Sequence, residues 1–269
     1  MSKENTAVTK KKIKRCKEDV VFDAACFIIL TLVLFVVAYP LYWVIISSIS
    51  APSAVSSGKV LLHPIGFTLK GYAEVFKNDQ VMRGFLNSLI ITFCGVMVNL
   101  IVTLPTSYAL SRSNFSGKKP ITIFYLITMF FGGGLIPTYL VIQRLQMLNT
   151  IWALILPGCL SVYNMIVART FFKSNISEEL YEAAEIDGCT QARFFFQIAL
   201  PLSKAIIAIL VLYYGVGHWN SYFSALVYIS DKAKYPLQLV LRNILITNQT
   251  ALSQTATTAA ARAALQEKQ

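Results

Sequence analysis

The sequence predicts an all-α protein, a polytopic bundle of transmembrane helices. Of its 269 residues, 55% are hydrophobic and only 14% are charged, which is too apolar for an ordinary soluble domain. The apolar residues also gather in long blocks almost free of charge, and a helix needs about 20 such residues to cross a bilayer. Together these observations indicate a chain that crosses the membrane several times.

The net charge of +11 fits the same interpretation. Lys and Arg gather in short segments beside the apolar blocks, as the positive-inside rule predicts for cytoplasmic loops. This distribution favours a membrane protein over a nucleic-acid-binding one. Residues 1–23, 112–119 and 169–204 are assigned to the inside because they hold more Lys and Arg than the other connections. The amino terminus is therefore predicted to be cytoplasmic.

Five apolar blocks have spanning length, and they divide the chain into three regions. A basic cytoplasmic head (1–23) precedes a transmembrane domain (24–250), and an Ala/Thr-rich tail (251–269) follows, too short and too polar to be a span. The predicted spans are residues 24–46, 85–110, 121–142, 148–168 and 202–228. Residues 47–84 contain several Pro and Gly, so an irregular outer loop with one short helix is expected there.

Residues suited to catalysis or metal binding are few. The five cysteines are scattered without a CxxC pair, and His63 and His218 accompany no HExxH motif or carboxylate cluster. No catalytic or metal-ligating residue is therefore assigned. The chain also lacks a Gly-x4-Gly-Lys-Ser/Thr loop, so ATP would have to bind to another protein.

A short helix is predicted inside the cytoplasmic loop 172–201. Ser177 is a suitable N-cap, and Glu178 and Glu179 in the first turn complement the helix dipole. Gly188 is a natural stop, because glycine adopts a positive φ without steric cost. A helix of about ten residues is too short to be stable alone, so it needs a surface to pack on.

The side chains of this helix suit contact with another protein. Ala183 and Ala184 would let a partner approach closely, and three carboxylates could meet basic groups on it. These carboxylates belong to Glu182, Glu185 and Asp187. A solvated connecting helix is the alternative interpretation. Pro201 is expected to open the fifth span, since proline is tolerated in the first turn of a helix.

The spacing in this loop resembles that of a known family. The run Glu182-Ala183-Ala184-x3-Gly188-x9-Ile198-x-Leu200-Pro201 is similar, at each fixed position, to the loop signature of ABC-importer membrane subunits. In that family the loop helix, the coupling helix, docks on a cytoplasmic ATPase. The resemblance implies an ATPase-coupling set of Glu182, Ala183, Ala184, Asp187 and Gly188.

The same resemblance implies a fold and a set of partners. The fold is the helical bundle of type I ABC-importer permeases, in which a sixth span is expected; this sequence does not show it, and its tail is expected to be truncated or frameshifted. A second permease would complete a heterodimeric pore, and an extracellular sugar-binding protein would deliver the substrate. Two cytoplasmic ATPase subunits would hold ATP and Mg²⁺, so the chain itself would bind no cofactor.

Four further stretches resemble the carbohydrate branch of this family, in particular the second permease of systems that import oligosaccharides or polysaccharide fragments. They are residues 133–139, 148–150, 217–220 and 235–239. An importer of amino acids, polyamines or phosphate is the alternative. An autonomous secondary transporter is disfavoured, because spans two to five contain no acidic residue that could couple to an ion.

Polar residues at helical spacing predict a substrate path. In the fifth span they are Tyr213, Gly217, Asn220, Ser221 and Ser224, with Trp219 beside them; the second span contributes Gly95, Asn99, Thr103 and Thr106, and the fourth contributes Ser161 and Asn164. Polar side chains in a membrane bundle tend to face its interior or a water-filled cavity. Hydroxyls, amides and aromatic rings would suit sugars. Simple helix packing is the alternative for each of these residues.

A glycine-rich segment in the third span is a candidate gate near the outer face. It comprises Gly133, Gly134, Pro137 and Tyr139. Glycine and proline permit bending of a helix, so a gate is favoured here over the alternative, a frayed helix end.

Overall fold

The computed structural model describes residues 17–247 and 249–250, which form two compact units that divide after Lys77. The described residues are helices and connecting loops, with no strand among them. The predicted Ala/Thr-rich tail and residues 1–16 of the predicted head lie outside the described residues. Residues 17–23 of that head are the first turns of a helix.

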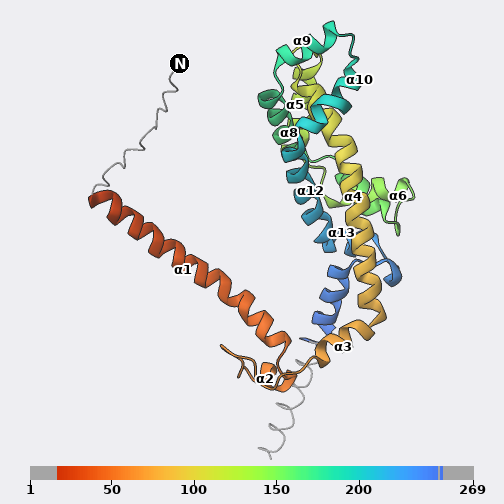
Figure 1. Cartoon of the computed structure of the whole chain (residues 1–269). Helices are drawn as coiled ribbons and strands as arrows, with labels where there is room; N and C mark the ends of the chain where they lie inside the picture. Colours follow the sequence, from red (N-terminus) through yellow and green to blue (C-terminus); the bar gives the residue numbers. More distant parts are fainter. Residues whose placement is uncertain (1–16, 248, 251–269) are drawn as a thin grey trace, which may run out of the picture. The chain divides into compact units, whose positions relative to one another are not determined.

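The first unit contains one long apolar helix and two short ones (Figure 1). Helix α1 (Lys17–Ser48) provides a membrane span at Val21–Ser48, and α2 (Pro52–Ser56) and α3 (Lys70–Lys77) follow. The prediction of one short helix in the outer loop is therefore wrong, because there are two. The loop folds back on α1, where Trp43 Nε1 donates a hydrogen bond of 2.8 Å to the Val60 carbonyl.

Helix α4 (Asp79–Ser111) is the longest element of the second unit. It packs against α8 and α12 and also contacts α5 and α7. The predicted start at residue 85 is wrong by six residues. Asn78 caps the helix, and its Oδ1 accepts hydrogen bonds from the backbone N–H of Gln80 (3.0 Å) and Val81 (3.3 Å), which fixes the start of α4 before its apolar block begins.

The other predicted spans are bent rather than straight. Helices α5 (Lys118–Phe130) and α6 (Leu135–Arg144) meet at 114°, and the segments α7–η1 (Trp152–Gly158) and α8 (Val162–Asn175) meet at 52°. The segment Gln191–Leu202 meets α12 (Lys204–Trp219) at 81°. Within residues 17–247 and 249–250, two helices, α1 and α4, are thus long and apolar enough to cross a membrane unbroken. Up to five spans result if each bent pair counts as one.

The fifth predicted span is also interrupted at its far end. Helix α12 stops at Trp219, and a separate helix α13 (Tyr222–Tyr228) follows. The Asn220 amide turns back to donate 2.9 Å to the Val216 carbonyl, and Ser221 Oγ donates 2.7 Å to the His218 carbonyl. These side chains satisfy the last carbonyls of α12 and end it, so the prediction of one continuous helix over 202–228 is wrong.

An apolar helix, Leu237–Thr247, lies beyond the last predicted span. Its first turn packs on α4: Leu239 is fully buried, and the Leu237 N–H donates 2.8 Å to Ser88 Oγ. No helix is predicted for this segment from the sequence. The sequence pattern missed it because its apolar residues are interrupted by Gln238, Arg242 and Asn243.

Polar side chains join the helices inside the second unit. Asn99 on α4 donates to the carbonyls of Gly158 (2.8 Å) and Cys159 (3.0 Å), and its Oδ1 lies 2.7 Å from His218 Nε2 on α12. Gly95, one turn earlier on α4, leaves the space that the His218 ring occupies. His218 is thus a hydrogen-bonded residue inside the bundle.

Gly95→Ala is expected to lower the stability of the bundle. The new Cβ would lie 2.5–2.7 Å from atoms of the His218 ring, so the ring must move and its contact with Asn99 is lost. Overpacking of this kind costs about 1–3 kcal/mol, which would appear as a lower melting temperature of the detergent-solubilised protein. Gly215→Ala is the matched control, because its Cβ would meet only Val96 Cγ2 at 3.9 Å; an equal loss in both variants would contradict the prediction.

Candidate functional site

The candidate site is a series of short helices at one end of the second unit. After α8 come α9 (Glu178–Ile186), α10 (Gln191–Phe194), the π-helix η2 (Phe195–Ala199) and α11 (Leu200–Leu202), which leads into α12. Figure 1 shows α9 and α10 gathered with α5 and α8 at this end. The predicted loop helix is therefore present as α9, at the end of the bundle.

The ends of α9 are those that the sequence predicts. Ser177 Oγ accepts a hydrogen bond of 3.3 Å from the Leu180 N–H, which confirms the N-cap. Asp187 ends the helix, and Gly188 follows with φ +73°. That backbone conformation is strained for any residue with a Cβ, so the glycine is required by the turn itself.

One face of α9 is buried against the bundle. Tyr181 and Ala184 are the buried residues of the helix, and both belong to an apolar cluster with Tyr108, Phe172 and Phe194. The Tyr181 ring meets Phe194 edge-on at 5.3 Å. The prediction that Ala184 offers its surface to a partner is thus wrong in this structure: its small side chain lets α9 approach its own bundle.

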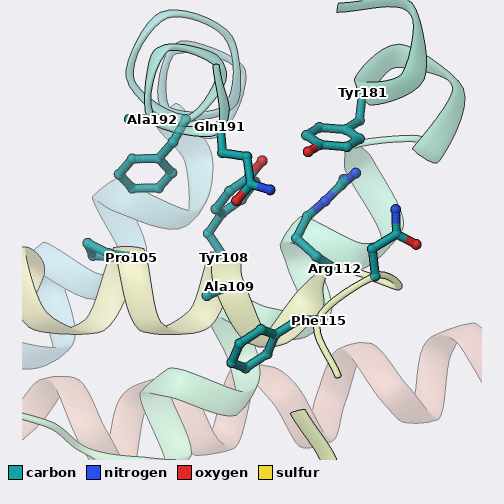
Figure 2. Close-up of a pocket in the computed structure, with 10 residues that line it drawn as sticks. Pro105, Tyr108, Ala109, Arg112, Phe115, Tyr181, Gln191 and Ala192 are labelled. Carbon is teal, nitrogen blue, oxygen red and sulfur yellow. The ribbon is translucent and has the colours of Figure 1, made fainter. Parts of the chain in front are cut away.

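A cationic contact holds this face in place (Figure 2). The guanidinium of Arg112, the C-cap of α4, lies 3.9 Å from the centroid of the Tyr181 ring and 3.2 Å from Glu178 Oε1. Ser113 Oγ donates to the same carboxylate oxygen. We call the three residues Arg112, Glu178 and Tyr181 the Arg112 clamp. Its arginine side chain is only 12% exposed, so the cation–π contact is shielded from water and stronger than at an open surface.

Beneath the clamp lies a cavity of about 280 Å³. Its lining combines the carboxyl end of α4 with residues of α9, α10 and η2, and includes the aromatic rings of Tyr108, Phe115, Tyr181 and Phe195. Figure 2 shows Arg112 and Gln191 as polar groups on its walls. The cavity therefore lies directly beside the contact that joins α9 to the end of α4.

The opposite face of α9 is open. Glu182, Ala183, Glu185 and Asp187 are exposed, and so is Gly188 after the helix. Ile186 is 87% exposed, and it is absent from the set of contact residues predicted from the sequence. It lies five residues after Tyr181, which at about 100° per residue places it on the far side of the helix. Counting from the buried tyrosine in this way could have revealed it.

Pro201 does not open the fifth span. It lies in the three-residue helix α11, before the 81° bend, and α12 begins at Lys204. The change of direction falls at Ser203, the residue between the two segments. The structure therefore corrects the predicted start of this span, although the proline still lies in a first helical turn.

The predicted path residues separate into two groups. Asn99, Thr103 and Asn164 are buried within the chain, and Thr103 Oγ1 pairs with Tyr214 Oη at 2.8 Å. For Asn99 and Thr103 the packing alternative is correct in this structure, because their polar groups are occupied by neighbouring helices. Since Asn164 is also buried, it offers no accessible surface. Gly95 on α4 is also buried, and Thr106 on α4 and Ser161 before α8 are partly buried.

The path residues of the fifth predicted span lie on α12, α13 and the break between them. Tyr213, Gly217 and Asn220 are exposed, and Trp219, Ser221 and Ser224 are partly buried. Because α12 ends at Trp219, they do not form the single continuous stripe that the sequence predicts. Trp219 meets Phe85 edge-on at 6.0 Å.

The candidate gate coincides with the sharpest bend of the chain. Gly133 lies between α5 and α6, and Gly134 caps α6 with φ +85°, so the bend of 114° falls at these glycines. Pro137 is exposed in the first turn of α6, and Tyr139 stacks on Tyr228 of α13 at 6.3 Å. A gating role for these residues stays a prediction.

Two asparagines fasten the loop at the other end of the second unit. Asn149 Oδ1 accepts from the N–H groups of Ser230 (3.3 Å) and Asp231 (3.0 Å), and Asn87 Nδ2 donates to the carbonyls of Ala233 (2.9 Å) and Tyr235 (3.0 Å). Asn149, in the stretch 148–150, thus holds the loop that leads into the stretch 235–239. Among the residues that the structure describes, no group of three His, Cys, Asp or Glu could hold a metal ion.

Within the described residues, helices long and apolar enough to cross a membrane define a multi-pass membrane protein. Helix α9, buried on one face and exposed on the other, lies at one end of the second unit. No protein-family model matches the chain. The polygalacturonan/rhamnogalacturonan transport system permease YtcP of Bacillus subtilis is 38% identical over 225 residues, covering 84% of this chain and 78% of that protein. Protein LplC of the same organism is 39% identical over 226 residues, covering 84% and 76%.

A solved structure gives the same result. A bacterial ABC transporter involved in the import of the acidic polysaccharide alginate superposes with a TM-score of 0.80 at 28% identity, covering 85% of this chain and 81% of that one. The chain therefore belongs to the family of ABC-transporter permease subunits, as its loop signature predicted. It is a transport subunit rather than an enzyme, and an importer of a different solute class is not favoured.

Arg112→Ala is expected to loosen α9. The substitution removes the cation–π contact and leaves Glu178 without its ion pair, at a cost of about 1–2 kcal/mol. Hydrogen–deuterium exchange in the α9 peptide should therefore quicken by about tenfold. Arg193→Ala is the control, since Arg193 is exposed and its Nε bonds only to Gln197, 2.9 Å away on the adjoining turn; unchanged exchange in the Arg112 variant would show that the clamp does not hold the helix.

Proposed function

We propose that the chain is one of two membrane subunits of an ATP-driven importer for oligosaccharides or polysaccharide fragments. The cargo is inferred from the relatives, whose names specify polygalacturonan, galactooligosaccharides and alginate. The exposed aromatic, amide and glycine positions on α12 support this cargo, because sugars stack on rings and hydrogen-bond to amides. These positions are Tyr213 and Gly217, with Asn220 at the C-cap of α12. Because the Asn220 Nδ2 group donates to the Val216 carbonyl, its side-chain carbonyl is the group left for a sugar.

The two-faced geometry of α9 carries the proposal. Its inner face is fixed by Tyr181, Ala184 and the Arg112 clamp, while its outer face presents carboxylates around an exposed Ile186. An isolated apolar side chain that is 87% exposed gains free energy when a partner pocket covers it, about 1.5–3 kcal/mol for an isoleucine. Basic groups around such a pocket would pair with Glu182 and Glu185 and set the orientation of docking.

The partner at this face is a cytoplasmic ATPase that holds the ATP and Mg²⁺. Two such subunits would bind the importer, one at this chain and one at a second permease that completes the pore. When the ATPases close, α9 moves with them, and the clamp passes the displacement to α4 because Arg112 is the residue at its end. Rotation of one helical bundle against the other then alternates access to the path.

The remaining partners lie on the opposite side of the membrane. With α9 on the cytoplasmic side, the amino terminus lies in the cytoplasm and the loop 229–236 lies outside. That loop is ordered by Asn87 and Asn149, so it offers a fixed surface to an extracellular sugar-binding protein. Residues 47–84, which the charge distribution assigns to the outside, are a second candidate contact.

Gly188→Pro and Glu182→Lys are each expected to abolish sugar uptake by cells while the protein remains in the membrane. Proline cannot adopt the φ of +73° found at residue 188, and lysine places a positive charge where the partner is expected to be basic. Uptake of labelled oligosaccharide and the amount of inserted protein should be measured together. Normal uptake in both variants would refute the assignment of α9 as the coupling helix.

Ile186→Asp is expected to release the ATPase. Burying a charge in place of an isoleucine removes the apolar contact and adds desolvation cost, so the recovery of the ATPase with the tagged permease should fall at least about tenfold. Ile186→Leu keeps an apolar side chain and should retain the complex. Recovery of the ATPase equally with both variants, or no ATPase with the unaltered protein, would contradict the proposal.

A further inference from the structure

A second cavity, of about 320 Å³, lies between the carboxyl end of α4, the start of α5 and the last turns of α8. It is separate from the clamp cavity and shares no lining residue with it. Half of its eight lining residues are cationic, and none is acidic: Lys118, Lys119, Arg169 and Lys173 surround it. A concave site with four positive charges and no carboxylate is suited to an anion.

Two of these cations already have a structural partner. Lys118 Nζ donates to the carbonyls of Arg112 (3.2 Å) and Ser113 (2.9 Å), and Arg169 Nε donates 3.0 Å to the Leu110 carbonyl. These carbonyls belong to the carboxyl end of α4 and the residues just after it. The dipole of α4 places about half a negative charge at that end. The helix end therefore offsets only a small part of the four positive charges.

The other two cations are exposed at the rim. Lys119 and Lys173 have exposed side chains, and within the described residues neither is joined to an acidic group by an ion pair. Because they lie on different helices, α5 and α8, a ligand between them would contact both. The cavity thus has an excess of positive charge where a ligand could enter.

The wall next to these charges is apolar and open. Ile123 lines the cavity, and on the same helix Phe124 and Ile127 follow at greater distance from the charged end. Their exposed fractions are 57%, 64% and 51%. Cations at a helix end, followed by open apolar side chains one and two turns into the bundle, match the headgroup and acyl chain of a phospholipid.

We propose that this cavity binds the phosphate headgroup of an anionic phospholipid of the inner leaflet, with an acyl chain along the apolar face of α5. The proposal rests on the proposed function only in placing this end of the bundle at the cytoplasmic side. A free phosphate ion would use the same cations but would gain nothing from the apolar wall. An acidic segment of the second permease would compete for the same charges.

The bound headgroup would also act on the candidate site. Its phosphate lies beside Lys118 and Arg169, which hold the end of α4, and that end carries Arg112 of the clamp. Neutralising these cations reduces their mutual repulsion, so the position of Arg112 becomes better defined. The lipid is therefore a positioning ligand for the coupling end of the permease.

The test is native mass spectrometry of the intact complex, purified in mild detergent from membranes that contain phosphatidylglycerol. Lys119→Gln/Lys173→Gln removes two rim charges without touching the bonds made by Lys118 and Arg169. Lys204→Gln/Lys232→Gln is a control of equal net charge outside the cavity. Since each cation near an anionic lipid contributes about fivefold in binding, the rim variant should retain at least about tenfold less phosphatidylglycerol than the unaltered protein and the control.

Equal lipid retention in all three proteins would overturn the proposal, and so would loss of the second permease, instead of lipid, from the rim variant. Displacement of the lipid by inorganic phosphate would assign the site to a soluble anion. Reconstitution gives a second readout: vesicles of phosphatidylcholine with phosphatidylglycerol should protect the α9 peptide from hydrogen exchange more than phosphatidylcholine alone. Recovery of the ATPase is measured in the same spectra, so failure of the proposed function is seen separately from failure of the lipid site.

Discussion

The contact of Arg112 with Tyr181 and Glu178 is the constraint on which the exposed end of the molecule depends. Helix α9 has nine residues and would not be stable alone; its order comes from the clamp and from the burial of Tyr181 and Ala184. The same contact divides the helix into a fixed face and a free face. A partner that binds the free face therefore acts on a helix that is mechanically joined to α4, because the arginine is the C-cap of that helix.

Bent spans impose a second constraint, since each break exposes backbone groups that the membrane cannot hydrate. The break before α8 leaves the carbonyls of Gly158 and Cys159 free, and Asn99 donates to both. At the same break, Tyr214 Oη accepts a hydrogen bond of 3.2 Å from the Ser161 N–H. The same hydroxyl is hydrogen-bonded to Thr103 Oγ1. Polar residues of α4 and α12 thus satisfy the backbone of a third helix. Their helical spacing suggested a path for sugar, but it is equally explained by these hydrogen bonds to the backbone at the break.

Local features of the site could be predicted from the sequence, and features set by tertiary contacts could not. Ser177 and Gly188 act on their own turn of α9, so residue type was sufficient to place them. The burial of Ala184 depends on Phe194 and Tyr108, which are distant in sequence or on another helix. The start of α4 was missed because apolar block length marks the part of a helix in hydrocarbon rather than the whole helix. The helix Leu237–Thr247 was missed because polar residues interrupt its apolar pattern.

The length of α4 connects the two ends of the second unit. Its 33 residues extend about 50 Å at 1.5 Å per residue, which exceeds the roughly 30 Å of a bilayer core. Near its start Asn87 and Ser88 hold the loop and helix at residues 233–237, and at its end Arg112 holds α9. A displacement of α9 can therefore reach the opposite surface through one continuous helix. Because Asn99 binds the middle of α4 to the broken fourth span and to α12, the same movement must also shift the helices that carry the exposed positions of the path.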